Sequence, residues 1–544
     1  MYSRSFYKPG EPVEIAVTLR AGGEGSARAR LAADFRSIGA SLGEVQQEIT
    51  LTPAAQPQGF ELTWQPPAVA GHGYGVDLRV ESASGQVLAT ASSAFDVLES
   101  WTQNPRYGFM SDFYPGRSDA AQTMTTLAGY HVNALQFYDW MYRHDTFLTD
   151  QEPYVDLFGR SLSRQTVNVM IAAAHARGIA AMPYTAVYAC SMDFYKQHPD
   201  WAMFNPDGTP HVFIEGKMVY MDPRPGSPWV QHLLAQFDDV LARTAFDGIH
   251  LDQYGDPKTA FDAQGIPYDV GTPLAELINA THDLVAKDRP QGGAVVFNAV
   301  TNWPVEKVAP ANEDVVYIEV WSPYNYFTDL HNLIAQAQTF GKNKPVVLAA
   351  YIDPALEANA RLMEAIIYAS GGGHIALGEQ DGYLADPYFP KYRLLSPGLS
   401  ADLKRYIEFS IRYQDVIGPN AREATTAWQN RIRVAGAETV PAMPFNKVYP
   451  LVRENGAFTG VSLVNLVGLK QGEWAKAAGE PAALGATSVQ IGQVSRPVKA
   501  VWFASPDQPG LELHPLPFEQ TDGSLQMEIP GLSYWDLILI EWGD

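Results

Sequence analysis

Short apolar stretches alternate with longer segments that can hold helices between residues 107 and 379. This alternation is typical of a parallel sheet built from βα units. Eight such stretches within roughly 300 residues favour a closed (β/α)8 TIM barrel over an open sheet. The predicted strands are residues 107–113, 134–140, 180–187, 246–252, 294–298, 315–321, 345–351 and 373–379.

A different pattern flanks this region on both sides. Residues 12–19 near the start and 460–466 near the end alternate polar and apolar positions, and Gly and Pro often interrupt such stretches. Period-two alternation with frequent turns predicts an immunoglobulin-like β-sandwich at the N-terminus and a second β-sandwich at the C-terminus. Because 544 residues exceed one ordinary domain, we predict three, at residues 1–100, 101–424 and 425–544.

The formal net charge is −22, from 60 acidic and 38 basic residues. Such a field repels phosphate backbones and anionic lipid heads, so we expect neither nucleic acid nor a membrane surface as a partner. A neutral polymer meets no such repulsion. The chain has 12 Trp, 27 Tyr and 24 Phe, whose flat rings stack well on sugars, although most aromatic residues in any protein fill cores.

The single cysteine, Cys190, excludes an intrachain disulfide and a cysteine-rich metal site. The chain runs from Met1 directly into a strand-like region, without an apolar stretch of signal-peptide or membrane-span length. Two interpretations remain open: a cytoplasmic protein, or a mature secreted protein whose leader has been removed. We expect the secreted form, acting as a monomer without membrane insertion.

Polar residues stand at the ends of the predicted barrel strands. All strands of such a barrel point the same way, so their C-terminal ends converge on one rim, where the active sites of this fold lie. A single acid that ends an apolar stretch is as often a helix cap, but several acids converging on one rim favour a reaction centre. The candidates are Asp112, Asp139, Tyr184, Asp252, Asn298, Glu319, Tyr351 and Glu379.

Two carboxylates stand out among these candidates. Asp252 ends the stretch 246–252, and Glu319 lies inside the otherwise hydrophobic stretch 315–321. Asp252 could instead cap a helix, and Glu319 could form a buried salt bridge. Desolvation within an apolar strand raises the pKa of a carboxyl group, which suits a proton donor. Hydrolysis of a glycosidic bond needs two such groups, one that attacks the anomeric carbon and one that protonates the leaving oxygen.

Other reaction types find little support in the sequence. His250 precedes Asp252 by two residues, but no His-x-His pair follows a strand. No Gly-x-Ser-x-Gly, P-loop or Gly-x-Gly-x-x-Gly motif stands between a predicted strand and a helix. We therefore predict neither a metal nor an organic cofactor.

Four segments carry a family resemblance when they are taken in order. They are residues 135–144 (LQFYDWMYRH), 246–255 (FDGIHLDQYG), 297–300 (FNAV) and 317–321 (YIEVW), joined by the opening YKPGEPV at residues 7–13. Together they resemble glycoside hydrolase family 66, which holds bacterial endo-dextranases and cycloisomaltooligosaccharide glucanotransferases. The similarity covers nearly the whole chain, and the family's architecture is likewise a sandwich, a barrel and a C-terminal sandwich.

The resemblance implies a retaining mechanism on α-1,6-linked glucan. Asp252 is implied as the nucleophile that forms a β-glucosyl-enzyme, and Glu319 as the acid that protonates the leaving sugar and then the base that activates water. From their positions near the rim, we predict sugar contacts for further residues, each of which taken alone is as often structural. They are Asp139, His144, Tyr184, Tyr188, Asn298, Trp303, Trp321 and Tyr351.

We thus predict a retaining endo-hydrolase of α-1,6-glucosidic linkages in dextran that releases isomaltooligosaccharides. The cyclising transferases of the family carry an extra carbohydrate-binding module inserted in the barrel region. The longest unassigned connection here, residues 189–228, is too short for that module, which favours the dextranase. A cycloisomaltooligosaccharide glucanotransferase and a non-catalytic glucan-binding protein remain the alternatives.

Overall fold

The computed structural model describes residues 2–22, 25–53, 56–214, 216–290, 292–439 and 443–543. Met1 and Asp544, the ends of the first and last predicted domains, lie outside the described residues. Among the described residues, none of the helices combines the length and the apolar character needed to cross a membrane.

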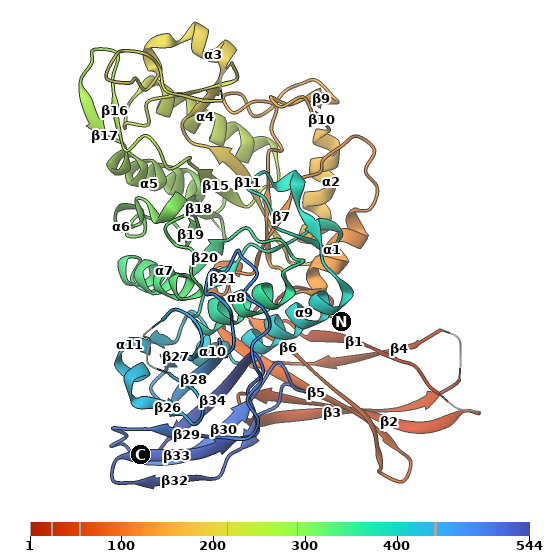
Figure 1. Ribbon diagram of the computed structural model, residues 1–544. Helices are drawn as coiled ribbons and strands as arrows, with labels where there is room; N and C mark the ends of the chain where they lie inside the picture. Colours follow the sequence, from red (N-terminus) through yellow and green to blue (C-terminus); the bar gives the residue numbers. More distant parts are fainter. Residues whose placement is uncertain are drawn as a thin grey trace.

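The centre of the molecule is a curled sheet of eleven strands (Figure 1). Each of the eight predicted stretches contains a strand, and neighbours in the series pair in parallel. The strands are β7 (Tyr107–Met110), β8 (Ala134–Phe137), β11 (Ala180–Ala186), β15 (Gly248–Asp252), β18 (Ala294–Asn298), β19 (Val315–Glu319), β20 (Val346–Ala349) and β21 (Gly373–His374).

The eighth predicted strand is divided into two short pieces. The first piece, β21, pairs with β20, and the second, β22 (Leu377–Gly378), pairs in parallel with β7. One short stretch of chain therefore contacts both the seventh and the first strand of the series. The short antiparallel strands β23 (Gly382–Tyr383) and β24 (Arg393–Leu394) extend the sheet beyond β22.

Successive side chains of these short strands pack alternately into two different cores. In β18, Val296 packs into the core inside the curled sheet, whereas Val295 and Phe297 pack into the core beneath the helices. Both faces are apolar and buried, as expected for a parallel sheet covered on both sides. The covering helices are α1 (Ala120–Gly129), α2 (Arg164–His175), α4 (Pro228–Arg243), α5 (Gly271–Asp288), α7 (Phe327–Phe340), α8 (Glu357–Ala369) and α9 (Pro397–Arg412).

The connection at residues 189–228, expected to be a loop, holds a small sheet and a helix. Strand β14 (Met218–Tyr220) pairs with both β12 (Ala189–Ser191) and β13 (Val212–Ile214), and α3 spans Met192–Gln197. Two more hairpins decorate the same end of the molecule in Figure 1: β9 (Tyr154–Val155) with β10 (Ser161–Leu162), and β16 (Thr259–Phe261) with β17 (Pro267–Asp269).

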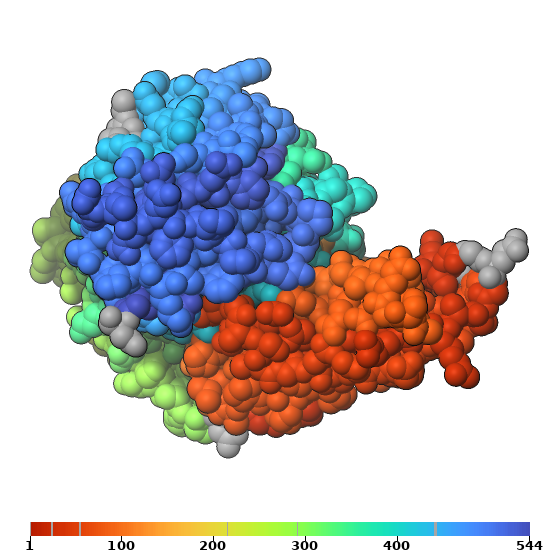
Figure 2. Space-filling view, turned by 90° about the horizontal axis from the view of Figure 1, so that it is seen from below, coloured from red at the N-terminus to blue at the C-terminus, as the bar shows by residue number. Residues whose placement is uncertain are grey.

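Two antiparallel sheets precede the curled sheet and share one apolar core. They are β1 (Val13–Leu19) with β4 (Gln58–Trp64), and β2 (Ala27–Ser37), β3 (Ala40–Leu51), β5 (His72–Ser82) and β6 (Val87–Val97). In the view from below, this red and orange part extends sideways beyond the rounded remainder (Figure 2). Its assignment to the immunoglobulin-like type stays a prediction.

The N-terminal sheets contact α9 through a partly buried ion pair. Arg412 of α9 is fully buried as a side chain and donates two hydrogen bonds to Asp77 of β5, at 2.7 Å and 2.9 Å. Gly73 of β5 lies against the backbone of the same helix, and a Cβ atom there would stand 1.8 Å from the carbonyl oxygen of Ile411. The close approach of strand and helix therefore depends on glycine at this position.

Two further antiparallel sheets follow the curled sheet and share a second apolar core. The first contains β25 (Arg422–Glu423), β27 (Val448–Glu454), β28 (Phe458–Asn465), β34 (Trp535–Trp542), β30 (Val498–Ala504) and β31 (His514–Pro515). The second contains β26 (Ile432–Val434), β29 (Thr487–Ile491), β33 (Ser524–Ile529) and β32 (Phe518–Thr521). The domain boundaries at residues 100 and 424 stay predictions.

Candidate active site

A cavity of about 930 Å³, including its open mouth, lies at the C-terminal ends of the parallel strands. It combines carboxylates with many aromatic rings. Eight of the ten predicted site residues line it: Asp139, His144, Tyr184, Asp252, Asn298, Glu319, Trp321 and Tyr351. The remaining lining comes from Gln136, Tyr138, Phe158, Phe213, Met218, His250, Gln253, Tyr254, Val300, Tyr317, Pro387 and Phe389.

Asp252 is the last residue of β15, and both of its carboxylate oxygens accept hydrogen bonds inside the cavity. Tyr184 Oη donates to Asp252 Oδ2 at 2.7 Å, and Asn298 Nδ2 donates to Asp252 Oδ1 at 2.6 Å. The donors come from the two neighbouring strands, β11 and β18. The carboxylate is thus held by its sheet neighbours, and the helix-cap interpretation does not apply.

Glu319 is the last residue of β19 and lies beside the same asparagine. Tyr351 Oη donates to Glu319 Oε1 at 2.7 Å, and Asn298 Nδ2 donates to Glu319 Oε2 at 3.0 Å. Asn298 Oδ1 also accepts a 3.2 Å hydrogen bond from the backbone N–H of Glu319, which fixes the orientation of the amide. Glu319 has no basic partner in the described structure, so the salt-bridge interpretation does not apply.

Asn298 sets an upper limit on the separation of the two acids. Its Nδ2 atom lies 2.6 Å from Asp252 Oδ1 and 3.0 Å from Glu319 Oε2, so these two oxygens are no more than 5.6 Å apart. Both carboxylates can therefore reach one sugar linkage, which the sequence alone did not reveal.

Burial changes the acidity of this pair. Burial and the nearby charge of Glu319 raise the pKa of Asp252 to about 7, against the lowering effect of Tyr184 and Asn298. Burial also raises the pKa of Glu319, while hydrogen bonds from Tyr351 and Asn298 lower it. Two like charges this close disfavour simultaneous ionisation, so the pair titrates as a unit that holds one proton near neutral pH.

Asp139 and His144 form a second polar group on the cavity wall. Asp139 is nearly fully buried and follows β8 with a positive φ of 47°. Burial raises its pKa to about 7, although Arg160, 3.7 Å away, partly offsets this effect. His144 Nε2 lies 4.0 Å from Asp139 Oδ1, and burial lowers the pKa of His144 to about 4. His144 is therefore uncharged at neutral pH, and both groups can exchange hydrogen bonds with hydroxyl groups.

Tyr188 and Trp303 do not line the cavity. Tyr188 is fully buried, and its hydroxyl donates to Gln253 Oε1 at 3.1 Å. The backbone carbonyl of Trp303 accepts a 3.1 Å hydrogen bond from Gln253 Nε2. Both residues thus hydrogen-bond Gln253, which does line the cavity, and their sugar contacts stay predictions.

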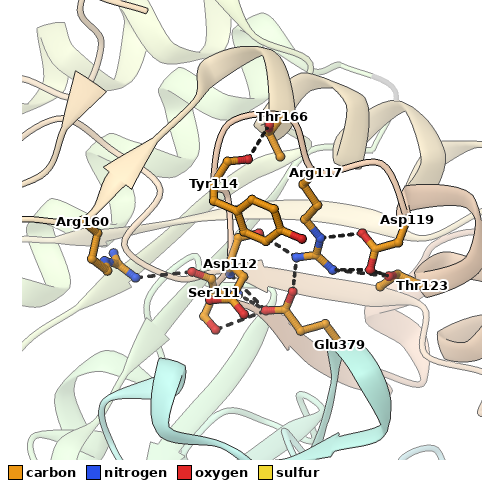
Figure 3. A network of polar contacts seen from close by, with 9 residues as sticks. All are labelled: Ser111, Asp112, Tyr114, Arg117, Asp119, Thr123, Arg160, Thr166 and Glu379. Atoms are coloured by element: carbon orange, nitrogen blue, oxygen red, sulfur yellow. Dashed lines mark hydrogen bonds and ion pairs between the residues drawn. The ribbon is translucent and has the colours of Figure 1, made fainter. Parts of the chain in front are cut away.

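Glu379 also differs from the expectation for the rim. Its carboxylate is fully buried and pairs with Arg117, while the backbone N–H groups of Ser111 and Asp112 donate to its Oε1 at 2.7 Å and 3.0 Å (Figure 3). The backbone N–H groups of residues 111 and 112 thus bond to this side chain and not to a neighbouring strand, and β7 ends just before them, at Met110. Glu379 fastens the loop after β7 to the end of β22, and Asp112 does not line the cavity.

His250 faces the bottom of the cavity and contacts Tyr107. Its Nδ1 atom lies 3.0 Å from Tyr107 Oη, and burial lowers the pKa of the imidazole to about 3. Across the part of the chain that the structure describes, no group of three or more His, Cys, Asp or Glu side chains is arranged to hold a metal ion.

Sequence reasoning missed Phe213 and Tyr254. Phe213 lies in the long connection after the third strand, and Tyr254 follows Asp252 by two residues. Their rings stack in parallel, 3.9 Å between centroids and 5° between planes, on the cavity wall. For Phe213 the signal was the richness of that connection in aromatic residues, whereas Tyr254 lies within the segment 246–255 that carries part of the family resemblance.

The family model described as glycosyl hydrolase family 66 matches residues 3–539. Two cycloisomaltooligosaccharide glucanotransferases of Niallia circulans are similar: one is 29% identical over 65% of this chain and 38% of its own length, the other 24% identical over 98% and 71%. A dextranase of Streptococcus salivarius is 21% identical over 79% of this chain and 61% of its own length. The chain thus spans well under half of the first relative.

The crystal structure of a Paenibacillus cycloisomaltooligosaccharide glucanotransferase, complexed with cycloisomaltoheptaose, has a similar fold. The TM-score is 0.91, with 21% identity over 99% of this chain and 98% of that one. The alignment with the second Niallia circulans relative has 695 positions, 151 more than the 544 residues of this chain, so at least 151 of its positions have no counterpart here.

Proposed function

Because the chain belongs to glycosyl hydrolase family 66, we propose that it is a retaining endo-hydrolase of α-1,6-glucosidic linkages in dextran and releases isomaltooligosaccharides. The observation that carries this proposal is the pair of carboxylates bridged by Asn298, whose oxygens Asp252 Oδ1 and Glu319 Oε2 are no more than 5.6 Å apart, as the distances of 2.6 Å and 3.0 Å require. Retaining glycosidases place their two carboxyl groups about 5–5.5 Å apart, and inverting ones about 6.5–9.5 Å.

The proposed reaction has two displacements. Asp252 attacks the anomeric carbon as Glu319 protonates the glycosidic oxygen, so the bond to the leaving sugar breaks and a β-glucosyl ester forms. Glu319, now ionised, removes a proton from water, which attacks the anomeric carbon and releases Asp252. Each step inverts the anomeric centre, and the product therefore regains the α configuration.

The electrostatics of the pair suit these roles. The first displacement requires the shared proton on Glu319 and an ionised Asp252. Tyr184 and Asn298 both donate to Asp252 and stabilise its charge. Once the ester forms, Asp252 carries no charge, so the Coulomb effect that keeps the proton on the pair disappears and Glu319 can ionise.

Hydrolysis and cyclisation differ only in what attacks the glucosyl-enzyme. The names of the two Niallia circulans relatives favour a glucanotransferase as the second candidate. The 151 or more alignment positions without a counterpart in this chain favour the hydrolase, because the cyclising enzymes are expected to carry an inserted module. A non-catalytic glucan-binding protein is the third candidate, and it leaves the carboxylate pair without a role.

Incubation with dextran, followed by mass spectrometry and a reducing-sugar assay, tests the proposal. We expect linear isomaltooligosaccharides and a rise in reducing ends. Products lighter than the linear ones by one water, without reducing ends, would identify a cyclising transferase. Dextran that is bound but unchanged would leave only the binding protein.

The sequence also led to expectations about architecture and setting, which we retain as proposals. We propose that the curled sheet is a (β/α)8 barrel, because β21 pairs with β20 and β22 with β7. We propose that the protein acts as a monomer. Secretion is proposed because a high-molecular-weight polymer does not cross membranes. Gel filtration and cell fractionation test the last two.

A further inference from the structure

Phe213 is an exposed apolar side chain on the wall of a polar cavity. It is 46% exposed, although it lines the same cavity as Asp252 and Glu319. Apolar rings usually leave water when they can, so a ring that stays exposed beside a reaction centre suggests a ligand surface. Its neighbour in the strand, Val212, is 44% exposed but does not line the cavity.

The backbone of the small sheet aims Phe213 at the cavity. In the pairing of β13 with β14, Val212 faces Val219 and Ile214 faces Met218, so Phe213 is an extra residue without a partner. Such a bulge bends the strand and redirects a side chain, and bulges are common beside active sites.

A stack of aromatic rings supports Phe213 from behind. Tyr254 lies parallel to it at 3.9 Å, and Tyr220 lies 5.6 Å from Tyr254 at 18°. The Tyr254 backbone N–H donates to Tyr188 Oη at 2.9 Å, which anchors the stack to the end of β15. Tyr254 thus covers one face of Phe213, and Tyr254 itself follows Asp252 by two residues.

Other aromatic residues of the cavity lie close to this wall or on the side of Glu319. Lys217, at the turn before β14, places its ammonium group 5.3 Å from the ring centre of Phe158, which also lines the cavity. On the side of Glu319, Trp321 is 39% exposed and lies 5.5 Å from Tyr351. Exposed aromatic side chains therefore occur both on the wall near Asp252 and on the wall near Glu319.

We propose that the Phe213 ring is a binding platform for a glucose unit of the glucan that lies outside the linkage being cleaved. The proposal rests on the proposed function for the class of ligand. A pyranose presents a patch of axial C–H groups that packs on an aromatic face, and an immobile ring loses little entropy on binding. The platform gives the enzyme affinity for long chains and supports cleavage within them.

Kinetics on a series of isomaltooligosaccharides and on dextran test the platform. We expect Phe213→Ala to raise KM for dextran and isomaltoheptaose about tenfold, with kcat changed less than twofold and with a smaller effect on the shortest cleavable member. Phe213→Trp should restore the wild-type KM. Val212→Ala, which removes an equally exposed apolar side chain outside the cavity, is the matched control and should behave as wild type.

Calorimetric binding of isomaltoheptaose to the Glu319→Gln variant, with and without Phe213→Ala, separates the platform from the chemistry. Weaker binding without Phe213 supports the platform even if wild type cleaves no dextran, in which case the proposed function alone fails. Equal KM values and affinities for Phe213→Ala and Val212→Ala would overturn the proposal that Phe213 is a binding platform. A loss of kcat together with a lower melting temperature in Phe213→Ala would also overturn it, because the ring would then be structural.

Discussion

Asp252 and Glu319 accept hydrogen bonds from one and the same nitrogen atom, Nδ2 of Asn298. Each acid also has a tyrosine of its own, Tyr184 for Asp252 and Tyr351 for Glu319. Asn298 is thus a hydrogen-bond donor shared by both acids, whereas Tyr184 and Tyr351 each donate to one acid only. Substitutions of these three residues can therefore separate their effects.

Removal of either carboxylate tests the proposed catalytic pair directly. Asp252→Asn and Glu319→Gln keep the shape of each side chain but remove the attacking oxygen or the transferable proton. We expect each to lower the rate of dextran cleavage by at least about 10²–10⁴, with an unchanged circular dichroism spectrum. Near-normal turnover by either variant would contradict the assignment.

Azide separates the two roles. In Glu319→Ala the glucosyl-enzyme still forms on an activated substrate, but no base activates water, so azide can attack in its place. We expect partial recovery of the rate and an α-glucosyl azide, detectable by NMR. Asp252→Ala should yield no product of α configuration, and an α-azide from that variant would reverse the assignment.

Loss of the shared donor should shift the pH dependence. The hydrogen bonds from Asn298 lower the pKa of both Asp252 and Glu319. Asn298→Ala should therefore raise both, by about one unit, and move both limbs of the kcat/KM profile to higher pH. A profile that falls in amplitude but keeps its limbs would show that Asn298 acts on substrate binding alone.

The two tyrosines should act on opposite limbs of that profile. Tyr184 lowers the pKa of Asp252, which must be ionised, so Tyr184→Phe should move the acidic limb to higher pH. Tyr351 lowers the pKa of Glu319, which must be protonated, so Tyr351→Phe should move the basic limb to higher pH. Identical profiles for the two variants would contradict separate roles for the two acids.

The buried pair of Arg117 and Glu379 should matter for stability. Neither side chain is exposed, and Glu379 also accepts three hydrogen bonds from the backbone and hydroxyl groups of residues 111 and 112. Glu379→Ala leaves these donors without an acceptor and should cost about 3–5 kcal/mol. Thermal unfolding checks this, with the exposed pair Lys196 and Asp193 as a control whose removal should change little.

The sequence was sufficient to predict the site residues that stand at the ends of strands. Asp252, Asn298 and Glu319 close β15, β18 and β19, and a parallel sheet brings such ends together whatever the loops do. Tyr188 could not be placed in this way, because it lies beyond the end of β11, where the loop and not the strand period sets its direction. The eighth strand was found, but its division into β21 and β22 was not.

Tertiary contacts decided the remaining positions. Glu379 has the sequence environment of a rim carboxylate, and only the arrival of Arg117 from the loop after β7 shows it to be structural. Phe213 depends on a bulge in a three-residue strand, which leaves no periodic pattern to detect. Contacts between residues far apart in the chain and local irregularities of the backbone are the two features that could not be predicted from the sequence alone.

The pairing of β22 with β7 also has a consequence for how the protein folds during synthesis. Arg117 and Glu379 are 262 residues apart along the chain. Their contact therefore closes a very long loop, and the entropy cost of loop closure means that it forms late in folding. A chain leaving the ribosome carries Asp252 and Glu319 well before it reaches residue 379. Until then the nascent sheet has an open edge, and the protein is most exposed to aggregation and to chaperones in that interval.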